Sequence, residues 1–356
     1  MLTLISFIVV INLIVFVHEF GHYIAARLSG VMVEIFSIGM PPKMFGKKIG
    51  DTLYQIAWVP LGGFVKLRGM IDESMDEDID PNDPEGFMAQ PLLNKVFILS
   101  AGVIMNMLLA FVIYSALTWN SGVTELAGTE ITMVAEDFPA ADAGIVVGDI
   151  IISIAGQDVK EWEELTTLVR DHPDEPIAVN WMRDDSLYTA TLVPKATEEF
   201  NLKTFETETV GKIGVIGSFT TQAVGPLTAM KYGALQVGWV IELSGKSLLA
   251  LVTGKANIKD VAGPIGIAKM SGESAKSGVA NFLGFIALIS VSIGFLNILP
   301  IPMLDGGHIV FVVIEGVIRR EIPETVKLNI MKVGFALLIL LLVVVSYHDI
   351  LRFFAG

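Results

Sequence analysis

Three stretches of this 356-residue chain are long and apolar enough to cross a membrane: residues 2–28, 96–119 and 282–304. A hydrocarbon core takes about 20 apolar residues of helix. A fourth stretch, residues 333–347, is shorter but almost wholly apolar, and the chain as a whole is 53% apolar. These features predict a multi-pass α-helical membrane protein with about four transmembrane helices.

Two other apolar segments have alternative interpretations. Residues 235–252 carry Glu242 and Lys246 at i, i+4 spacing, which favours an amphipathic helix at the membrane interface over a fifth span. Residues 1–16 have the length of a signal-peptide core. Because they lack a basic n-region and no charged side chain precedes His18, a first membrane span is the better interpretation.

With four spans, the first and the third run in the same direction across the bilayer. Basic residues follow both of them: Lys43, Lys47, Lys48, Lys66, Arg68 and Lys95 after the first, and Arg319, Arg320 and Lys327 after the third. The positive-inside rule therefore places both loops in the cytoplasm and residues 125–280 outside it.

Composition excludes several classes of partner and site. The net charge of −14 argues against a nucleic-acid partner, and the absence of cysteine excludes disulfides and thiolate zinc sites. Part of the negative charge is local, in a run that also holds Pro81 and Pro84: Asp72, Glu73, Asp76, Glu77, Asp78, Asp80, Asp83 and Glu85. We interpret this run as a solvated loop, with a cation site as the alternative.

Residues 125–195 have the pattern of a small β-rich module. The predicted strands are residues 130–136, 149–155, 177–183 and 187–193, and the predicted helices are residues 140–143 and 161–171. Residues 139–156 contain G-D-x-I-x-x-I-x-G and resemble the signature of PDZ domains. The resulting plan has four parts: residues 1–120, the PDZ-like domain 125–195, an extracytoplasmic connector with an amphipathic helix at 196–280, and residues 281–356.

The first span contains the sequence H-E-x-x-H, formed by His18, Glu19 and His22. Residues i and i+4 share one face of a helix, so the two imidazoles can bind one metal while the glutamate stands beside it. A catalytic zinc needs a third protein ligand. Asp305, at similar depth after the parallel third span, is the candidate, and His308 is the alternative.

The region around Asp305 has further polar and helix-breaking residues. Pro300 and Pro302 interrupt the third span, and irregular backbone at membrane depth has to be buried or line a wet cavity. Asn297 should also face inward. By contrast, we expect Asn12 to form a helix-packing hydrogen bond, and His172 and His348 to be surface or interfacial residues.

Residues 51–66 have the composition of strands with a turn at Gly62–Gly63 and predict a β-hairpin associated with the membrane. Two functions are open: a purely structural hairpin, or a strand edge that receives substrate. A receiving edge has a physical reason, since a transmembrane helix must be unwound before a protease can cleave it.

Taken together, these motifs resemble the site-2 protease family of intramembrane zinc metalloproteases, in its bacterial regulated-intramembrane-proteolysis branch. The resemblance rests on H-E-F-G-H at 18–22, N-x-x-P-x-P-x-L-D-G at 297–306 and the PDZ-like module. Residues 59–67 and A-G-P-I-G-I-A at 262–268 extend it over nearly the whole chain.

The resemblance implies zinc held by His18, His22 and Asp305, with Glu19 as the catalytic base. It favours Asn297 as a residue that holds the substrate backbone or the oxyanion. The other candidates for contact with substrate are Pro300, Pro302, Gly62 and Gly63. The expected substrates are single-pass membrane proteins, such as an anti-sigma factor or a remnant signal peptide. The expected location is the bacterial cytoplasmic membrane, with the active site near the cytoplasmic side.

Two other functions remain as alternatives: a membrane-anchored PDZ scaffold with a vestigial metal site, and a zinc-binding transporter. The sequence does not identify the substrate, the cleavage position, the oligomeric state or the route by which water and substrate enter. It also leaves open whether the PDZ-like domain filters substrates by size or reads a new C-terminus.

Overall fold

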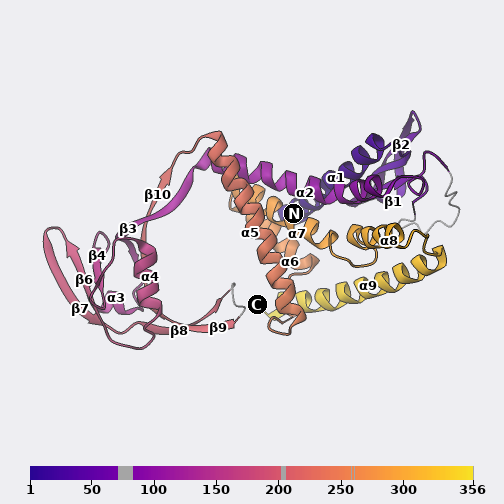
Figure 1. Cartoon of the computed structure of the whole chain (residues 1–356). Helices are drawn as coiled ribbons and strands as arrows, with labels where there is room; N and C mark the ends of the chain where they lie inside the picture. The colour runs from indigo at the N-terminus through magenta and orange to yellow at the C-terminus, as the bar shows by residue number, and fades with distance from the viewer. Residues whose placement is uncertain (71–82, 202–205, 258, 260, 356) are drawn as a thin grey trace. The chain divides into compact units, whose positions relative to one another are not determined.

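The structure is a computed structural model, and it describes residues 1–70, 83–201, 206–257, 259 and 261–355. The chain forms two compact units (Figure 1). The helical unit comprises Met1–Leu117, Leu227–Gly245 and Asn257–Gly356; the β-rich unit comprises Thr118–Pro226 and Lys246–Ala256. Most of the predicted acidic loop, residues 72–82, lies outside the described residues.

Five described helices are long and apolar enough to span a membrane, one more than the four predicted. They are α1 (Leu2–Leu28), α2 (Leu92–Ser121), α5 (Pro226–Val252), α7 (Val279–Asn297) and α9 (Glu324–Ala355). The additional helix, α5, is 27 residues long, which is longer than the predicted segment 235–252. It starts earlier than predicted, at Pro226, and proline is well suited to the first helical turn. Length and composition permit α5 to cross; its interfacial placement stays a prediction.

The helices α1, α2 and α7 share a core in which their directions can be followed. Val10 and Ile14 of α1 belong to one buried cluster with Ile113 of α2 and Ala287 of α7. Further along α1, His18 meets Asn106 of α2 and Asn297 of α7. Residue numbers thus rise together in α1 and α7 and fall in α2, as predicted for parallel first and third spans.

A buried aspartate near the end of α9 holds the start of helix α6 (Pro264–Lys276). The Asp349 carboxylate accepts hydrogen bonds from the N–H groups of Gly263 and Gly266, at 3.1 and 2.9 Å. A methyl group on either glycine would stand 2.7 or 3.2 Å from this carboxylate. These contacts explain the two glycines of the A-G-P-I-G-I-A motif: they let an acid approach the positive end of a helix.

Strands β1 (Val33–Ile49) and β2 (Thr52–Leu67) form an antiparallel hairpin that turns at Gly50, where φ is +62°. The predicted position of the turn, Gly62–Gly63, is wrong. Gly62 instead lies at a bend of β2, with φ of +87°. The partner strand is the preceding segment, whose alternation of apolar and polar residues is too irregular to predict a strand.

The bend in β2 makes residues 63–67 an edge strand of the sheet. Residues 53–56 of β2 pair with residues 35–38 of β1, and residues 63–67 of β2 pair with residues 33–38 of the same strand. The first part of β1 is therefore central. In the described part of the chain, no strand pairs with the outer side of residues 63–67.

Side chains of α1 anchor this hairpin. Tyr23 and Tyr54 join their hydroxyl groups at 2.7 Å, and the ring of Phe36 packs edge-on against Tyr23. The Asn12 amide donates hydrogen bonds to the carbonyl oxygens of Ile8 and Pro60, at 2.8 and 2.7 Å. Asn12 therefore forms the predicted packing hydrogen bond, and its partner in the second bond is β2, which it ties to the middle of α1 near the bend.

The β-rich unit is built around one sheet with strand order β10-β3-β4-β6-β7, in which β5 also pairs with β4. The strands are β3 (Val123–Val134), β4 (Ile150–Ile154), β5 (Gln157–Asp158), β6 (Ile177–Arg183), β7 (Ser186–Leu192) and β10 (Val215–Gln222); β8 (Lys195–Asn201) and β9 (Glu206–Lys212) form a separate hairpin. The four predicted strands and both predicted helices, α3 (Pro139–Asp142) and α4 (Trp162–Arg170), are confirmed. The sheet extends past the predicted limit of 195 because β10 pairs with β3.

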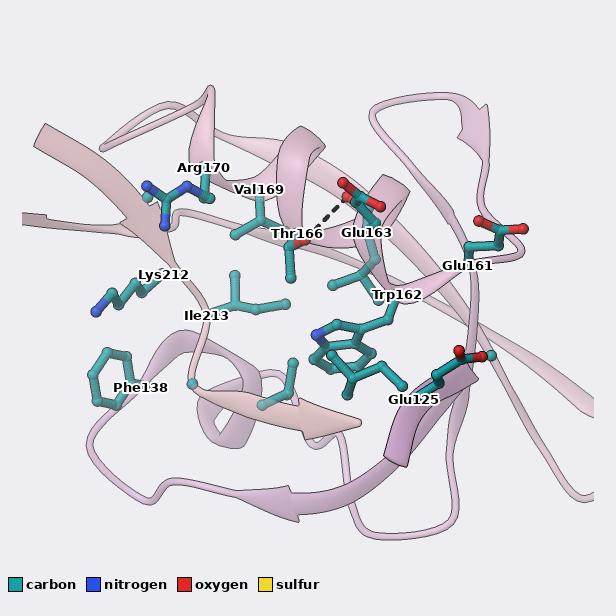
Figure 2. A pocket seen from close by; sticks show the side chains of 16 residues that line it. Glu125, Phe138, Glu161, Trp162, Glu163, Thr166, Val169, Arg170, Lys212 and Ile213 are labelled. Atoms are coloured by element: carbon teal, nitrogen blue, oxygen red, sulfur yellow. Dashed lines mark hydrogen bonds between the residues drawn. The ribbon is translucent and has the colours of Figure 1, made fainter. Parts of the chain in front are cut away.

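A groove of about 940 Å³ runs beside α4 in the β-rich unit (Figure 2). Val169 and Ile213 contribute apolar walls, and Arg170 and Lys212 stand at one end. Trp162 covers β10 at Gly217, where a methyl group would lie 2.4 Å from the indole ring. Val215, the first residue of β10, is among the residues that line the groove.

Candidate metal centre

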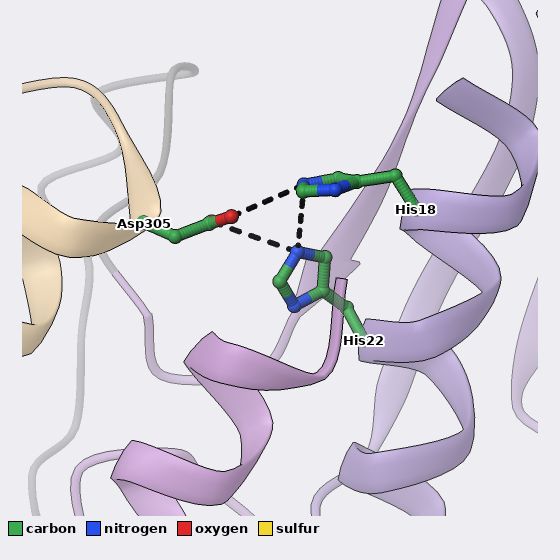
Figure 3. Close-up of side chains that lie close together, drawn as sticks. All are labelled: His18, His22 and Asp305. Atoms are coloured by element: carbon green, nitrogen blue, oxygen red, sulfur yellow. Dashed lines mark hydrogen bonds and ion pairs between the residues drawn. The ribbon is translucent and has the colours of Figure 1, made fainter. Parts of the chain in front are cut away.

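The structure brings His18, His22 and Asp305 together at the core of the helical unit (Figure 3). The two Nε2 atoms lie 3.2 Å apart. The Asp305 carboxylate oxygens lie 3.1 Å from Nε2 of His18 and 3.5 Å from Nε2 of His22. Both histidines are buried, with 6 and 8% of their surface exposed.

These three separations fit a tetrahedral zinc site. Ligands at about 2.0–2.1 Å from a tetrahedral zinc lie roughly 3.3 Å from one another. The observed separations of 3.1, 3.2 and 3.5 Å bracket that value, with the two histidines lying near different oxygens of the same carboxylate. Two imidazoles and a carboxylate are also a common donor set of catalytic zinc, and three protein ligands leave a fourth position open. The residues present therefore fit the ion.

Helix α2 packs against the two histidines and holds their rings in place. The Nδ1–H group of His22 donates to the carbonyl oxygen of Ile98 at 2.8 Å, so that Nε2 keeps its lone pair for a metal. Gly102 lies against both rings, since a methyl group there would stand 2.4 Å from Nε2 of His22 and 2.7 Å from Nε2 of His18. Only a residue without a side chain leaves room for the imidazoles.

The third candidate ligand, Asp305, is positioned by the break after α7. Helix α7 ends at Asn297, earlier than predicted, and Asp305 opens the next helix, α8 (Asp305–Ile318). Between them Met303 takes a φ of +79°, which is strained for a residue with a side chain. The carboxylate thereby sits at the positive end of α8, where a negative charge is favoured.

The two glycines after Asp305 allow the start of α8 to lie on this broken segment. A methyl group on Gly306 would stand 2.2 Å from the carbonyl oxygens of Ile298 and Leu299, and one on Gly307 would stand 2.3 Å from that of Ile301. The D-G-G sequence is thus a packing requirement. It brings the first turn of α8, and with it the Asp305 side chain, against the polar backbone that the prolines expose.

The metal centre opens into a cavity of about 430 Å³. Glu19, Asn297, His308 and residues 63–67 of β2 are among the residues that line it. The Asn297 amide nitrogen lies 3.3 Å from Nε2 of His18. His308 shares the cavity but is not one of the three clustered ligand groups, which leaves Asp305 as the third member.

Three of the predicted substrate-contacting residues lie outside this lining. Gly62 packs near Val15, and Pro300 is exposed. Pro302 contacts Gly334 of α9 and lines a separate apolar cavity. Gly63, by contrast, lines the cavity itself. The two remaining histidines lie apart from the centre: His172 bonds the carbonyl oxygen of Leu168, and His348 stacks edge-on with Tyr347.

Sequence reasoning missed the contribution of α2. The signal was present as Gly102 followed four residues later by Asn106, because a glycine and a buried amide in an apolar span indicate a close helix contact and a polar interior. The two residues lie on one face of α2, and both contact the histidines.

A model of peptidase family M50 matches residues 6–341. A protein of Rhizobium meliloti that carries a zinc metalloprotease name is 35% identical over 98% of this chain and 96% of its own length. Zinc metalloprotease RasP of Bacillus licheniformis is 30% identical over 99% of both chains, and the regulator of sigma-W protease RasP of Bacillus subtilis is 29% identical over 99% of both.

Among solved structures, the PDZ domain of an SdrC-like protein of Listeria monocytogenes matches 26% of this chain and 88% of that domain, at 26% identity. Its TM-score of 0.20 adds no argument to the sheet order described above. The family match, by contrast, covers the metal centre and both units. The chain therefore belongs to peptidase family M50, the site-2 protease family, and is a zinc metalloprotease.

Proposed function

We propose that this zinc metalloprotease hydrolyses a peptide bond inside the transmembrane segment of a single-pass membrane protein, at the centre formed by His18, His22 and Asp305. The observation that carries the proposal is the position of that centre. His18 lies 16 residues into α1, roughly 24 Å along an apolar helix. A peptide that reaches this depth is itself a membrane segment.

The residues around the centre have distinct roles in the reaction. When bound, zinc supplies a Lewis acid that polarises the scissile carbonyl and acidifies water. Glu19, which lines the same cavity, accepts the proton of the attacking water and passes it to the leaving amine. The amide of Asn297 donates a hydrogen bond to the substrate carbonyl oxygen as negative charge develops there.

The edge formed by residues 63–67 of β2 is the proposed substrate platform. A helical substrate has its backbone groups already paired, so it must be unwound and held extended before hydrolysis. The edge lines the cavity beside Glu19, and β1 occupies only its other side. A substrate added there as a strand would pair its backbone with β2 while the scissile bond lies near the metal centre.

We propose that the groove beside α4 binds the C-terminus of a substrate that has already been trimmed. Three features support a reader over a size filter: the apolar walls, the adjacent edge strand β10 and two cations at one end. Arg170 and Lys212 both form ion pairs with Glu199. An incoming terminal carboxylate would replace Glu199 as their partner.

The proposed physiological role is regulated intramembrane proteolysis in the bacterial cytoplasmic membrane. The Bacillus subtilis relative is named for a regulator of sigma-W, which supports an anti-sigma factor as the substrate class; a remnant signal peptide is the other class expected. The distribution of lysine and arginine supports an active site near the cytoplasmic side and an extracytoplasmic PDZ-like domain.

Reconstitution in liposomes with a transmembrane test substrate tests the main proposal. We expect wild type to cleave, Glu19→Gln to lose about 10²-fold or more in kcat while retaining zinc, and chelation to abolish cleavage. Equal cleavage in all three samples would contradict the assignment. Cleavage of a soluble peptide but not of the membrane-inserted one would contradict the intramembrane site. Zinc flux without cleavage would indicate a transporter.

The groove is tested separately with labelled peptides on the full-length protein. We expect a peptide with a free C-terminal carboxylate to bind at least about tenfold more tightly than its amide, because one charge-assisted hydrogen bond is at stake. Lys212→Ala should reduce that difference, since Arg170 remains, and Lys160→Ala, at an exposed lysine that does not line the groove, should preserve it. Equal binding of the acid and the amide would favour the size filter.

A further inference from the structure

A buried asparagine of α2 contacts the first of the two histidines. The side chain of Asn106 is fully buried, and its amide nitrogen lies 3.3 Å from Nδ1 of His18. Its amide oxygen has no hydrogen-bond partner among the described residues. A fully buried amide with an unsatisfied oxygen is costly in an apolar core, so its position calls for a function.

The orientation of this amide matters for metal binding. With nitrogen toward the ring, Nδ1 of His18 must be the acceptor, and the ring proton then sits on Nε2. Nε2 is the atom that lies 3.2 Å from His22 and 3.1 Å from Asp305, so a proton there would occupy the position of the metal. The two ends of an amide differ little in shape, and half a turn brings the oxygen to Nδ1 instead.

We propose that Asn106 is the positioning residue for His18: its oxygen accepts a hydrogen bond from Nδ1–H and leaves the Nε2 lone pair to bind zinc. This inference rests on the proposed set of metal ligands. The orphaned oxygen then has a partner, and the imidazole is fixed both in tautomer and in ring plane.

The same helix face supports both histidines in this way. The carbonyl oxygen of Ile98 accepts from His22, Gly102 leaves room for the rings, and Asn106 accepts from His18. These three residues are spaced four apart and so form one stripe along α2. The stripe matches the i, i+4 spacing of the histidines on α1, which runs antiparallel to it.

Contacts from α7 hold Asn106 in place. The hydroxyl of Ser290 donates a hydrogen bond to the backbone carbonyl oxygen of Asn106 at 2.9 Å. A methyl group on Gly294 would stand 3.3 Å from Cβ of Asn106, so the glycine lets α7 approach closely. The residue is therefore clamped between the helix that carries the histidines and the helix that leads to Asp305.

The test measures metal binding to the purified full-length protein, with Asn106→Leu, Asn106→Asp and the matched control Asn94→Leu, at a half-buried position in the first turn of α2. Zinc affinity is measured by competition with a chelator, and ligand geometry by the visible absorption of the cobalt-substituted protein. We expect Asn106→Leu to weaken zinc binding about 10–100-fold and to alter the cobalt spectrum. Asn106→Asp, which still accepts a hydrogen bond, should restore both.

Wild-type zinc affinity together with a wild-type cobalt spectrum in Asn106→Leu would overturn the inference. Asn106→Ala, which removes the amide without adding volume, gives the same reading if the leucine variant does not fold. His18→Ala separates this result from the proposed site: loss of zinc there with no effect of Asn106→Leu refutes only the positioning role. Retention of zinc in His18→Ala would refute the ligand set itself.

Discussion

Gly102 of α2 lies directly against the imidazole of His22: a methyl group on its α-carbon would stand 2.4 Å from Nε2. The distance is shorter than any stable non-bonded contact, and the added methyl group would clash with Nε2, the candidate ligand atom of His22. The metal centre thus depends on a residue that contributes no atom to it.

Gly102→Ala should therefore abolish zinc binding while the protein remains folded. The added methyl group displaces both imidazoles, and misplaced ligands cannot form a tetrahedral site. Zinc content after dialysis and proteolysis of a membrane-inserted substrate are the measurements. Gly284→Ala is the matched control, because a methyl group there meets only Leu117 at an ordinary 3.9 Å. Wild-type zinc content in Gly102→Ala would contradict the geometry.

Proline substitutions can test the edge of β2. In a strand, neighbouring N–H groups point to opposite sides, so of Phe64 and Val65 one N–H faces β1 and the other faces the outer side of the strand, where the substrate is proposed to pair. Proline removes the N–H group. The variant that loses the N–H on the outer side should cleave substrate with a kcat/KM about 2–12-fold lower, as expected for the loss of one hydrogen bond. Its thermal stability should equal that of wild type.

The other substitution should destabilise the hairpin, and both variants should keep their zinc. Zinc content, Tm and kcat/KM measured on the same samples separate the two effects. If both proline variants cleave the substrate at the wild-type rate, then residues 63–67 do not receive substrate as a strand.

Asp349→Ala should destabilise the helical unit. The carboxylate is only 4% exposed and accepts from Gly263 and Gly266, so its loss leaves two N–H groups at the start of α6 unpaired. An unsatisfied buried donor costs about 1–3 kcal/mol. Thermal unfolding in detergent should show a lower Tm for this variant and an unchanged one for Lys332→Ala, an exposed charge on the same helix. Equal Tm values would show that α9 does not hold α6.

Asp149 predicts a pH dependence of the β-rich unit. Burial alone would raise the pKa of its carboxyl group, but hydrogen bonds from Arg183 and from the Val146 N–H outweigh burial and hold the pKa below its ordinary value. A lowered folded-state pKa means that the stabilisation is complete above the unfolded-state pKa of about 3.9 and is lost as the pH falls through the folded-state value.

Hydrogen exchange of the Ile131 amide reports on this site, because that amide bonds the Asp149 carbonyl oxygen at 2.8 Å. We expect its protection factor in the full-length protein to be constant from pH 7 to about 5 and to fall below about pH 4. Asp149→Asn should lower protection at pH 7 and flatten the profile, whereas the exposed Asp158→Asn should match wild type. An unchanged profile in Asp149→Asn would contradict the prediction.

The features that are local in sequence could be predicted from it. His18 and His22 share a helix face because the period of an α-helix requires it, and the apolar length of α1 made that helix a membrane span. The strands β4, β6 and β7 followed from alternation and turn residues. The parity of the spans was enough to pair His18 with Asp305, 287 residues further along the chain.

Only the tertiary structure decided which surfaces meet. Gly102 and Asn106 indicate a close helix contact and a polar interior, but the pattern of an apolar helix does not say which neighbouring helix that face meets, so its contact with the histidines came only from the structure. Likewise, composition indicated strands near residues 51–66, but their pairing with β1 on both sides depends on a bend at Gly62. The candidate ligands of the metal can be named from the sequence. The contacts of α2 with the two histidines and the outer edge of β2 arise from packing between distant segments.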